Sequence, residues 1–122
     1  MKKITSEIQK LVEENALALA TINENGNPHC IAVGDCKVVG ENQILVSDNY
    51  MKQTVENIKR KNNISLCVWN KNWEDGGVGY EFVGTTQYFT EGKWREMVKK
   101  INEGFPAKGA ILVTVEEIKK LV

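Results

Sequence analysis

The sequence predicts a mainly β fold, a six-stranded antiparallel β-barrel with flanking helices. Six short apolar or alternating segments, bounded by turn residues, predict the strands. Three segments with apolar residues at helical spacing predict the helices. Most strands follow one another through turns, which favours an antiparallel barrel over a parallel sheet. With 122 residues and no linker or repeat, one domain is expected to span residues 1–122.

The first half of the chain is expected to form one helix and three strands. Apolar residues recur at helical spacing after Thr5 and Ser6, either of which is a suitable N-cap; they are Ile4, Ile8, Leu11 and Val12. Strands are predicted in "ALALATIN", "HCIAVGDCKVVG" (residues 29–40) and "ILVSD". The turn segments "ENGNP" and "GENQ" separate them, so these strands should form a three-strand meander.

The second half begins with a short helix whose buried face is set by Met51, Val55 and Ile58. The segments "NISLCVWN" and "GYEFVGTTQYFTEG" predict two more strands, separated by the loop "KNWEDGGV". A third helix is marked by Trp94, Met97, Val98 and Ile101. The segment "GFPAK" ends that helix, and "GAILVTV" is the sixth predicted strand.

Composition argues against several classes of partner. Lysine plus arginine and aspartate plus glutamate number 16 each, so no basic field exists to attract nucleic acid. The longest apolar runs fall short of the ~20 residues that cross a bilayer. The N-terminus is charged and lacks the apolar middle of a signal peptide, so a cytoplasmic location is expected.

The sequence lacks the common catalytic and metal-binding motifs. His29 is the single histidine, so no zinc cluster, and no metal site of any kind, is expected. Neither a GxSxG elbow nor a glycine-rich phosphate loop occurs. Cys30, Cys36 and Cys67 lack CxxC spacing and lie in apolar segments, which predicts buried core thiols.

Lys52 stands where the short helix begins, beside the positive end of the helix dipole. Gln53 and Thr54 share this first turn, whose backbone N–H groups lack partners within the helix. An ammonium, a hydroxyl, a carboxamide and free N–H groups together form an anion site, which suits a phosphate. The alternative is a solvated surface lysine with Thr54 acting as an N-cap.

The second predicted strand carries small residues at alternate positions. The set comprises Cys30, Ala32, Gly34 and Cys36. Small side chains leave space over the sheet for a planar ring, which the strand backbone near Val33 and Gly34 would hydrogen bond. The alternative is that a tight barrel requires small interior residues.

The order "ALATIN…NGNPH…V", "ILVSDNYMKQTVENIKRKNNISLCVW" and "GTTQYF" resembles the pyridoxamine 5'-phosphate oxidase-like family of FMN-binding split barrels. The resemblance covers nearly the whole chain and implies a split, Greek-key-like barrel with FMN as cofactor. It places the flavin phosphate at the helix start and the pyrimidine side of the ring along the second strand. The implied cofactor-binding residues are Ile31, Ala32, Val33, Gly34, Ser47, Asp48, Asn49, Lys52, Gln53 and Thr54.

The resemblance also implies a homodimer with two flavins in the interface, each partly covered by the partner chain. Four residues are candidates for this covering role: Trp94, Lys108, Leu121 and Val122. Trp73, in the glycine-rich loop, is a candidate lid.

The sequence departs from the family's vitamin-oxidising enzymes, which are longer and end in an Arg-x-His element. Here Gln53 stands where those enzymes carry a second basic residue, and the only arginines are Arg60 and Arg95. The expected function is therefore a small FMN protein that transfers electrons between a donor and an acceptor, without pyridoxamine phosphate oxidase activity and with no evident catalytic acid or base. The alternatives are flavin storage or sensing, or a relative that binds haem, a deazaflavin or nothing.

Overall fold

The structure is a computed structural model that describes residues 3–72, 74 and 76–121. The helices in this part of the chain are α1 (Ser6–Glu14), α2 (Gln53–Arg60) and α3 (Lys93–Ile101). The strands are β1 (Leu17–Ile22), β2 (Pro28–Val33), β3 (Lys37–Gly40), β4 (Gln43–Asp48), β5 (Asn63–Asn70), β6 (Val78–Phe89) and β7 (Gly109–Lys120).

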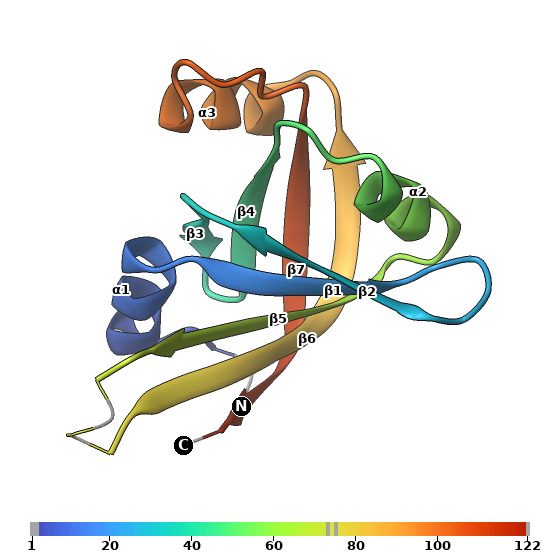
Figure 1. Cartoon of the computed structure of the whole chain (residues 1–122). Helices are drawn as coiled ribbons and strands as arrows, with labels where there is room; N and C mark the ends of the chain where they lie inside the picture. The colour runs from blue at the N-terminus through green and yellow to red at the C-terminus, as the bar shows by residue number, and fades with distance from the viewer. Residues whose placement is uncertain (1–2, 73, 75, 122) are drawn as a thin grey trace.

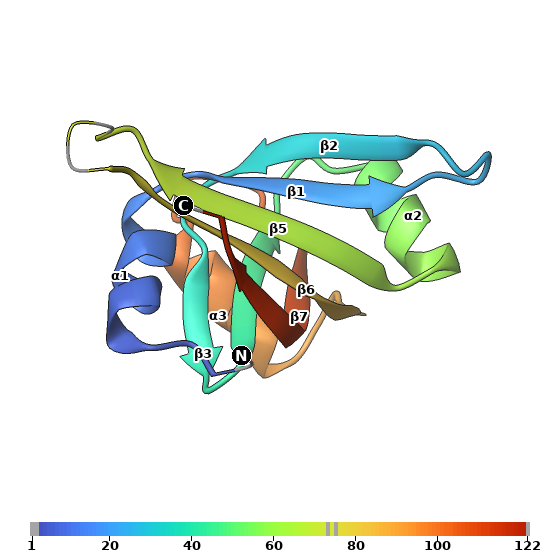
Figure 2. The same ribbon diagram turned by 90° about the horizontal axis from the view of Figure 1, so that it is seen from below.

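The strands form a seven-stranded antiparallel sheet in the order β2-β1-β5-β6-β7-β4-β3. The predicted mainly β, antiparallel class is confirmed, but the count of six strands was wrong, because the segment predicted as one strand over residues 29–40 forms two. The sheet stays open, with β2 and β3 as its edges. The meander β5-β6-β7 is joined on its far side by β4, a Greek-key type of connection. Figures 1 and 2 show the sheet curled so that β1, β2 and β5 cross over β4 and β7.

The long strands β6 and β7 run through both halves of the curled sheet, and their pairing shifts register between Val83 and Gly84. A Cβ atom at Gly84 would lie 2.1 Å from the carbonyl oxygen of Thr114. Only glycine allows this close approach of the two backbones, where the irregular pairing bends the sheet. The bend brings the two halves face to face around the core.

The predicted strand over residues 29–40 is in fact two strands, β2 and β3, which lie on opposite edges of the sheet. The break falls at Gly34 and Asp35, where Asp35 has a positive φ of 53° that cannot continue a strand. β2 pairs with β1, whereas β3 pairs with β4. The predicted three-strand meander was therefore wrong.

The main core lies between the two halves of the sheet and includes Leu19, Leu66, Ile111 and Phe82. α1 packs on it through Ile8 and Val12, as predicted. A second cluster of Leu45, Val98, Ala107, Ala110 and Leu112 lies where α3 covers β4 and β7 (Figure 1). In the described part of the chain, the helices are too short or too polar to cross a bilayer.

The cysteines were predicted as core thiols, and this is correct only for Cys36. Cys36 is buried in the main core, and its burial, aided by the nearby carboxylate of Asp35, raises its pKa to about 12. Cys67 is partly buried, and Cys30 is exposed. Alternate residues of β2 point to opposite faces, so Cys30 shares the outer face with Ala32.

Candidate functional site

A cavity of about 420 Å³ lies between the edge strand β2, the loop after β4 and the start of α2. Its lining consists of His29, Ile31, Ala32, Val33, Gly34, Ser47, Asn49, Tyr50, Met51, Lys52, Gln53 and Thr54. The structure thus brings together all of the predicted cofactor-binding residues except Asp48. His29, Tyr50 and Met51 also line the cavity and were not among the predicted cofactor-binding residues. The volume is within the range of about 300–1,000 Å³ that is usual for ligand pockets.

The first turn of α2 opens onto this cavity. Lys52 is the N-cap residue but makes no side-chain capping bond within the described residues, whereas Thr5 caps α1 by accepting from the N–H of Ile8. Thr54 is buried inside the first turn, so the alternative that Thr54 is the N-cap was wrong. An uncapped first turn keeps its N–H groups available to an anion in the cavity.

A buried asparagine, Asn57, attaches α2 to the sheet. The carboxamide oxygen of Asn57 accepts from Nε2 of Gln53 at 2.7 Å, and Nδ2 of Asn57 donates to the hydroxyl of Thr21 at 2.9 Å. Asn57 and Thr21 are both buried. Because unmade hydrogen bonds of buried amides are costly, this network fixes the angle of α2 and the direction of the Gln53 side chain. Pattern reasoning missed Asn57, which reads as an ordinary helix residue.

The other side of the cavity is the free edge of β2, whose outer backbone groups have no strand partner within the sheet. The predicted row of small residues does not form one face. Cys30 and Ala32 lie on the exposed face of β2, whereas Cys36 lies beyond the strand in the core. The chain edge at Val33 and Gly34, rather than a small-residue face, borders the space.

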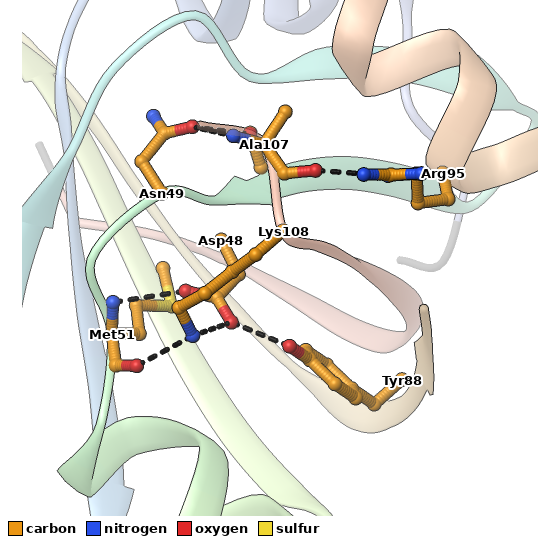
Figure 3. Close-up of polar contacts among 8 residues, drawn as sticks. Asp48, Asn49, Met51, Tyr88, Arg95, Ala107 and Lys108 are labelled. Carbon is orange, nitrogen blue, oxygen red and sulfur yellow. Dashed lines mark hydrogen bonds and ion pairs between the residues drawn. The ribbon is translucent and has the colours of Figure 1, made fainter. Parts of the chain in front are cut away.

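Asp48 is fully buried and is not among the residues that line the cavity, and Figure 3 shows its polar contacts. Its Oδ2 accepts from the hydroxyl of Tyr88 at 2.5 Å and from the ammonium of Lys108 at 2.6 Å. Its Oδ1 accepts from the N–H of Met51 at 2.9 Å. Burial and the hydrogen bond to Asp48 raise the pKa of Tyr88 above its ordinary value, so the phenol remains a donor. Asp48, which was predicted to bind the cofactor, is thus hydrogen bonded to groups of its own chain and is not part of the cavity lining.

Asn49 joins the loop to the chain that enters β7. Its Oδ1 accepts from the hydroxyl of Ser47 and from the N–H of Ala107, both at 3.0 Å. The carbonyl of Ala107 in turn accepts from Nε of Arg95 at 3.0 Å, as Figure 3 shows. The chain segment 47–51 is thereby held by α3 and by the chain that enters β7, both far away in sequence.

The residues named as candidates for covering a partner's flavin lie in different surroundings. The ammonium of Lys108 is bound to Asp48 and to the carbonyl of Met51 in its own chain. Trp94 packs against the second cluster, and Leu121 is exposed. Trp73 and Val122 lie outside the described residues. Within the described ranges, no group of three histidine, cysteine, aspartate or glutamate side chains is placed to hold a metal.

An open antiparallel sheet, with a cavity between an edge strand and the uncapped start of a helix, defines a small ligand-binding β protein. The family model described as pyridoxamine 5'-phosphate oxidase matches residues 4–121, and the chain belongs to this family. An uncharacterized protein of Methanocaldococcus jannaschii is 27% identical, over 98% of this chain and 81% of its own length.

Two solved structures show the same fold. HupZ from Group A Streptococcus superposes with a TM-score of 0.86 at 27% identity, covering 97% of this chain and 94% of that chain. An FMN-binding protein from Syntrophomonas wolfei gives a TM-score of 0.84 at 16% identity, covering 93% of this chain and 83% of that chain.

Proposed function

We propose that this protein binds FMN in the cavity between β2 and α2 and works as a small flavin-dependent oxidoreductase or electron carrier. The observation that carries the proposal is the convergence of Lys52, the uncapped first turn of α2 and the free edge of β2 on one cavity. Family membership and the likeness to an FMN-binding protein support the choice of a flavin.

The phosphate end of the ligand belongs at α2. A phosphate there would accept from the N–H groups of the first turn and neutralise the ammonium of Lys52, whose charge is otherwise unfavourable beside the helix N-terminus. Ser47 and Thr54 add hydroxyl groups on the same cavity wall. One cationic side chain on the lining suits a single phosphate ester better than a pyrophosphate.

The ring end belongs along β2. Unpaired N–H and C=O groups of an edge strand offer alternating donors and acceptors, which match the edge of the flavin pyrimidine. When bound, the flavin supplies the electron or hydride transfer, and the protein supplies orientation and the local field. His29, Tyr50 and Lys52 are the titratable side chains on the lining of the described cavity.

We further infer a homodimer in which the partner covers the flavin. Tyr50 lines the cavity with 75% of its surface exposed, and Ala32, also on the lining, is exposed as well. A flat ring resting on this wall would keep one face in water within a single chain. A second copy placed over the wall would bury that face and the aromatic side chain together.

Oxidation of pyridoxamine phosphate is not part of the proposed function. A second phosphate ester needs its own basic clamp, and no arginine is on the cavity lining within the described residues. Arg60 donates to the carbonyl of Ile22, and Arg95 donates to that of Ala107. Both guanidinium groups therefore make hydrogen bonds that stabilise the fold.

The test is to purify the protein, record its visible spectrum, release the pigment by heat and identify it by chromatography. FMN, with a spectrum that NADH, NADPH or dithionite bleaches reversibly, is the expected result. FMN that even dithionite cannot reduce would indicate storage or sensing. Haem, a deazaflavin, or no chromophore after incubation with FMN would contradict the proposal.

A further inference from the structure

We propose that Lys108 and Asp48 are positioning residues that hold the peptide before Lys52 in the orientation required to bind the ligand phosphate. This inference rests on the proposed function, because it concerns the same cavity. Neither residue is among those that line the cavity.

The two side chains hold both backbone polar groups of one residue, Met51, and so fix two successive peptide units. Oδ1 of Asp48 accepts from the N–H of Met51 at 2.9 Å, and the ammonium of Lys108 donates to the carbonyl of Met51 at 2.8 Å. Lys108 and Asp48 also bind each other at 2.6 Å. Figure 3 shows these contacts meeting beside Met51. The direction of the Met51 carbonyl fixes the plane of the next peptide, whose N–H belongs to Lys52.

Lys52 itself has no side-chain cap to define its backbone, and its φ of −128° and ψ of −63° are not those of a regular N-cap. The orientation of the first helical N–H groups therefore depends on the residues before the helix. Preorganised donors bind an anion more tightly than donors that must be ordered on binding. The Asp48–Lys108 pair orders the backbone before α2 by binding the N–H and the carbonyl of Met51. Asp48 ends β4, and Lys108 lies in the chain that enters β7.

The test compares Lys108→Met with Lys100→Met, a matched substitution at an exposed lysine of α3. Lys108→Met should weaken FMN binding by about tenfold, the size of a charge-assisted contact, and riboflavin binding by less than about twofold. In the ligand-free protein it should also speed amide hydrogen exchange by about tenfold at Met51 and Glu56, whose N–H groups bind Asp48 and the carbonyl of Lys52, since the turn opens more often. Lys100→Met should change neither quantity.

Lys108→Met alone leaves the buried carboxylate of Asp48 without its cationic partner, which can destabilise the fold. The double variant Asp48→Asn/Lys108→Met removes both charges and avoids this problem. It should show the same selective loss for FMN. Equal losses for FMN and riboflavin, or unchanged exchange at Met51 and Glu56 in both variants, would overturn the positioning role. If the wild-type protein binds no FMN, the proposed function fails, and the exchange measurement still decides whether Lys108 orders the turn.

Discussion

A Cβ atom at Gly109 would lie 2.2 Å from the hydroxyl oxygen of Tyr88. Tyr88 therefore reaches the carboxylate of Asp48 by passing directly over a residue that has no side chain. Gly109 is also the partner of Asp48 in the pairing of β4 with β7. Three strands thus meet at a point where only glycine leaves room for the Tyr88–Asp48 hydrogen bond.

Gly109→Ala should destabilise the protein by about 1.5–3 kcal/mol or more, because Tyr88 must swing away and abandon Asp48. Urea unfolding measures the change. Gly34→Ala is the matched control, since a Cβ there would meet nothing within 4 Å, and it should leave stability nearly unchanged. A Tyr88→Ala background should reduce the cost of Gly109→Ala. An equal cost in both backgrounds would show that the Tyr88 contact is not the cause.

Tyr88→Phe should also destabilise the protein, by about 1.5–3 kcal/mol near neutral pH, through loss of a hydrogen bond to a buried carboxylate. The folded protein raises the pKa of this phenol above its ordinary 10.0. The stabilisation is therefore complete below pH 10.0 and is lost as pH rises from there towards the folded-state pKa. Urea unfolding of both proteins should show a gap that narrows above pH 10.0, and a gap independent of pH would contradict this assignment.

Local patterns predicted most helices and strands of the fold but not how the strands pair in the sheet. Apolar spacing and turn residues located all three helices, because these signals act within a few residues. The break at Asp35 was missed, since its positive φ is imposed by the route of the chain between two sheet edges. A continuous alternating pattern carries no sign of such a break.

In the candidate site, too, residues within local motifs could be predicted, whereas contacts between distant parts of the chain could not. Residues 31–34 and 52–54 could be predicted, because they belong to local motifs at the end of a strand and the start of a helix. Asp48 was predicted as a cofactor-binding residue, but it ends β4 and is buried away from the cavity lining. Its partners Tyr88 and Lys108 are 40 and 60 residues away, and only the folded sheet brings these charges and donors together.

Gly34 offers a way to block the ring end of the cavity alone. Its position is open to the cavity, and a Cβ atom there meets no neighbour. Gly34→Val should therefore preserve the melting temperature while weakening FMN and riboflavin by the same factor, since both share the ring. Gly34→Ala should show a smaller loss of the same kind. Titration followed by flavin fluorescence measures both affinities, and loss confined to FMN would place the ring elsewhere.

The proposed dimer predicts a sedimenting mass of about twice 13.7 kDa for the flavin-loaded protein. Tyr50→Ala should weaken both dimerisation and flavin binding, because its exposed ring lies where the partner is proposed to cover the cavity. Analytical ultracentrifugation across a dilution series, with detection at the flavin absorbance, separates the species. A monomer that retains flavin would falsify the shared site.

The most direct test of the account is the ratio of the dissociation constants of FMN and riboflavin, measured for the wild-type protein and for Lys52→Ala. Only FMN carries the phosphate proposed to lie at the start of α2. Removal of Lys52 should weaken FMN by about tenfold to a hundredfold, and riboflavin by less than about twofold. Equal weakening of both ligands, or no weakening of FMN, would contradict the phosphate site and leave Lys52 as a solvated surface lysine.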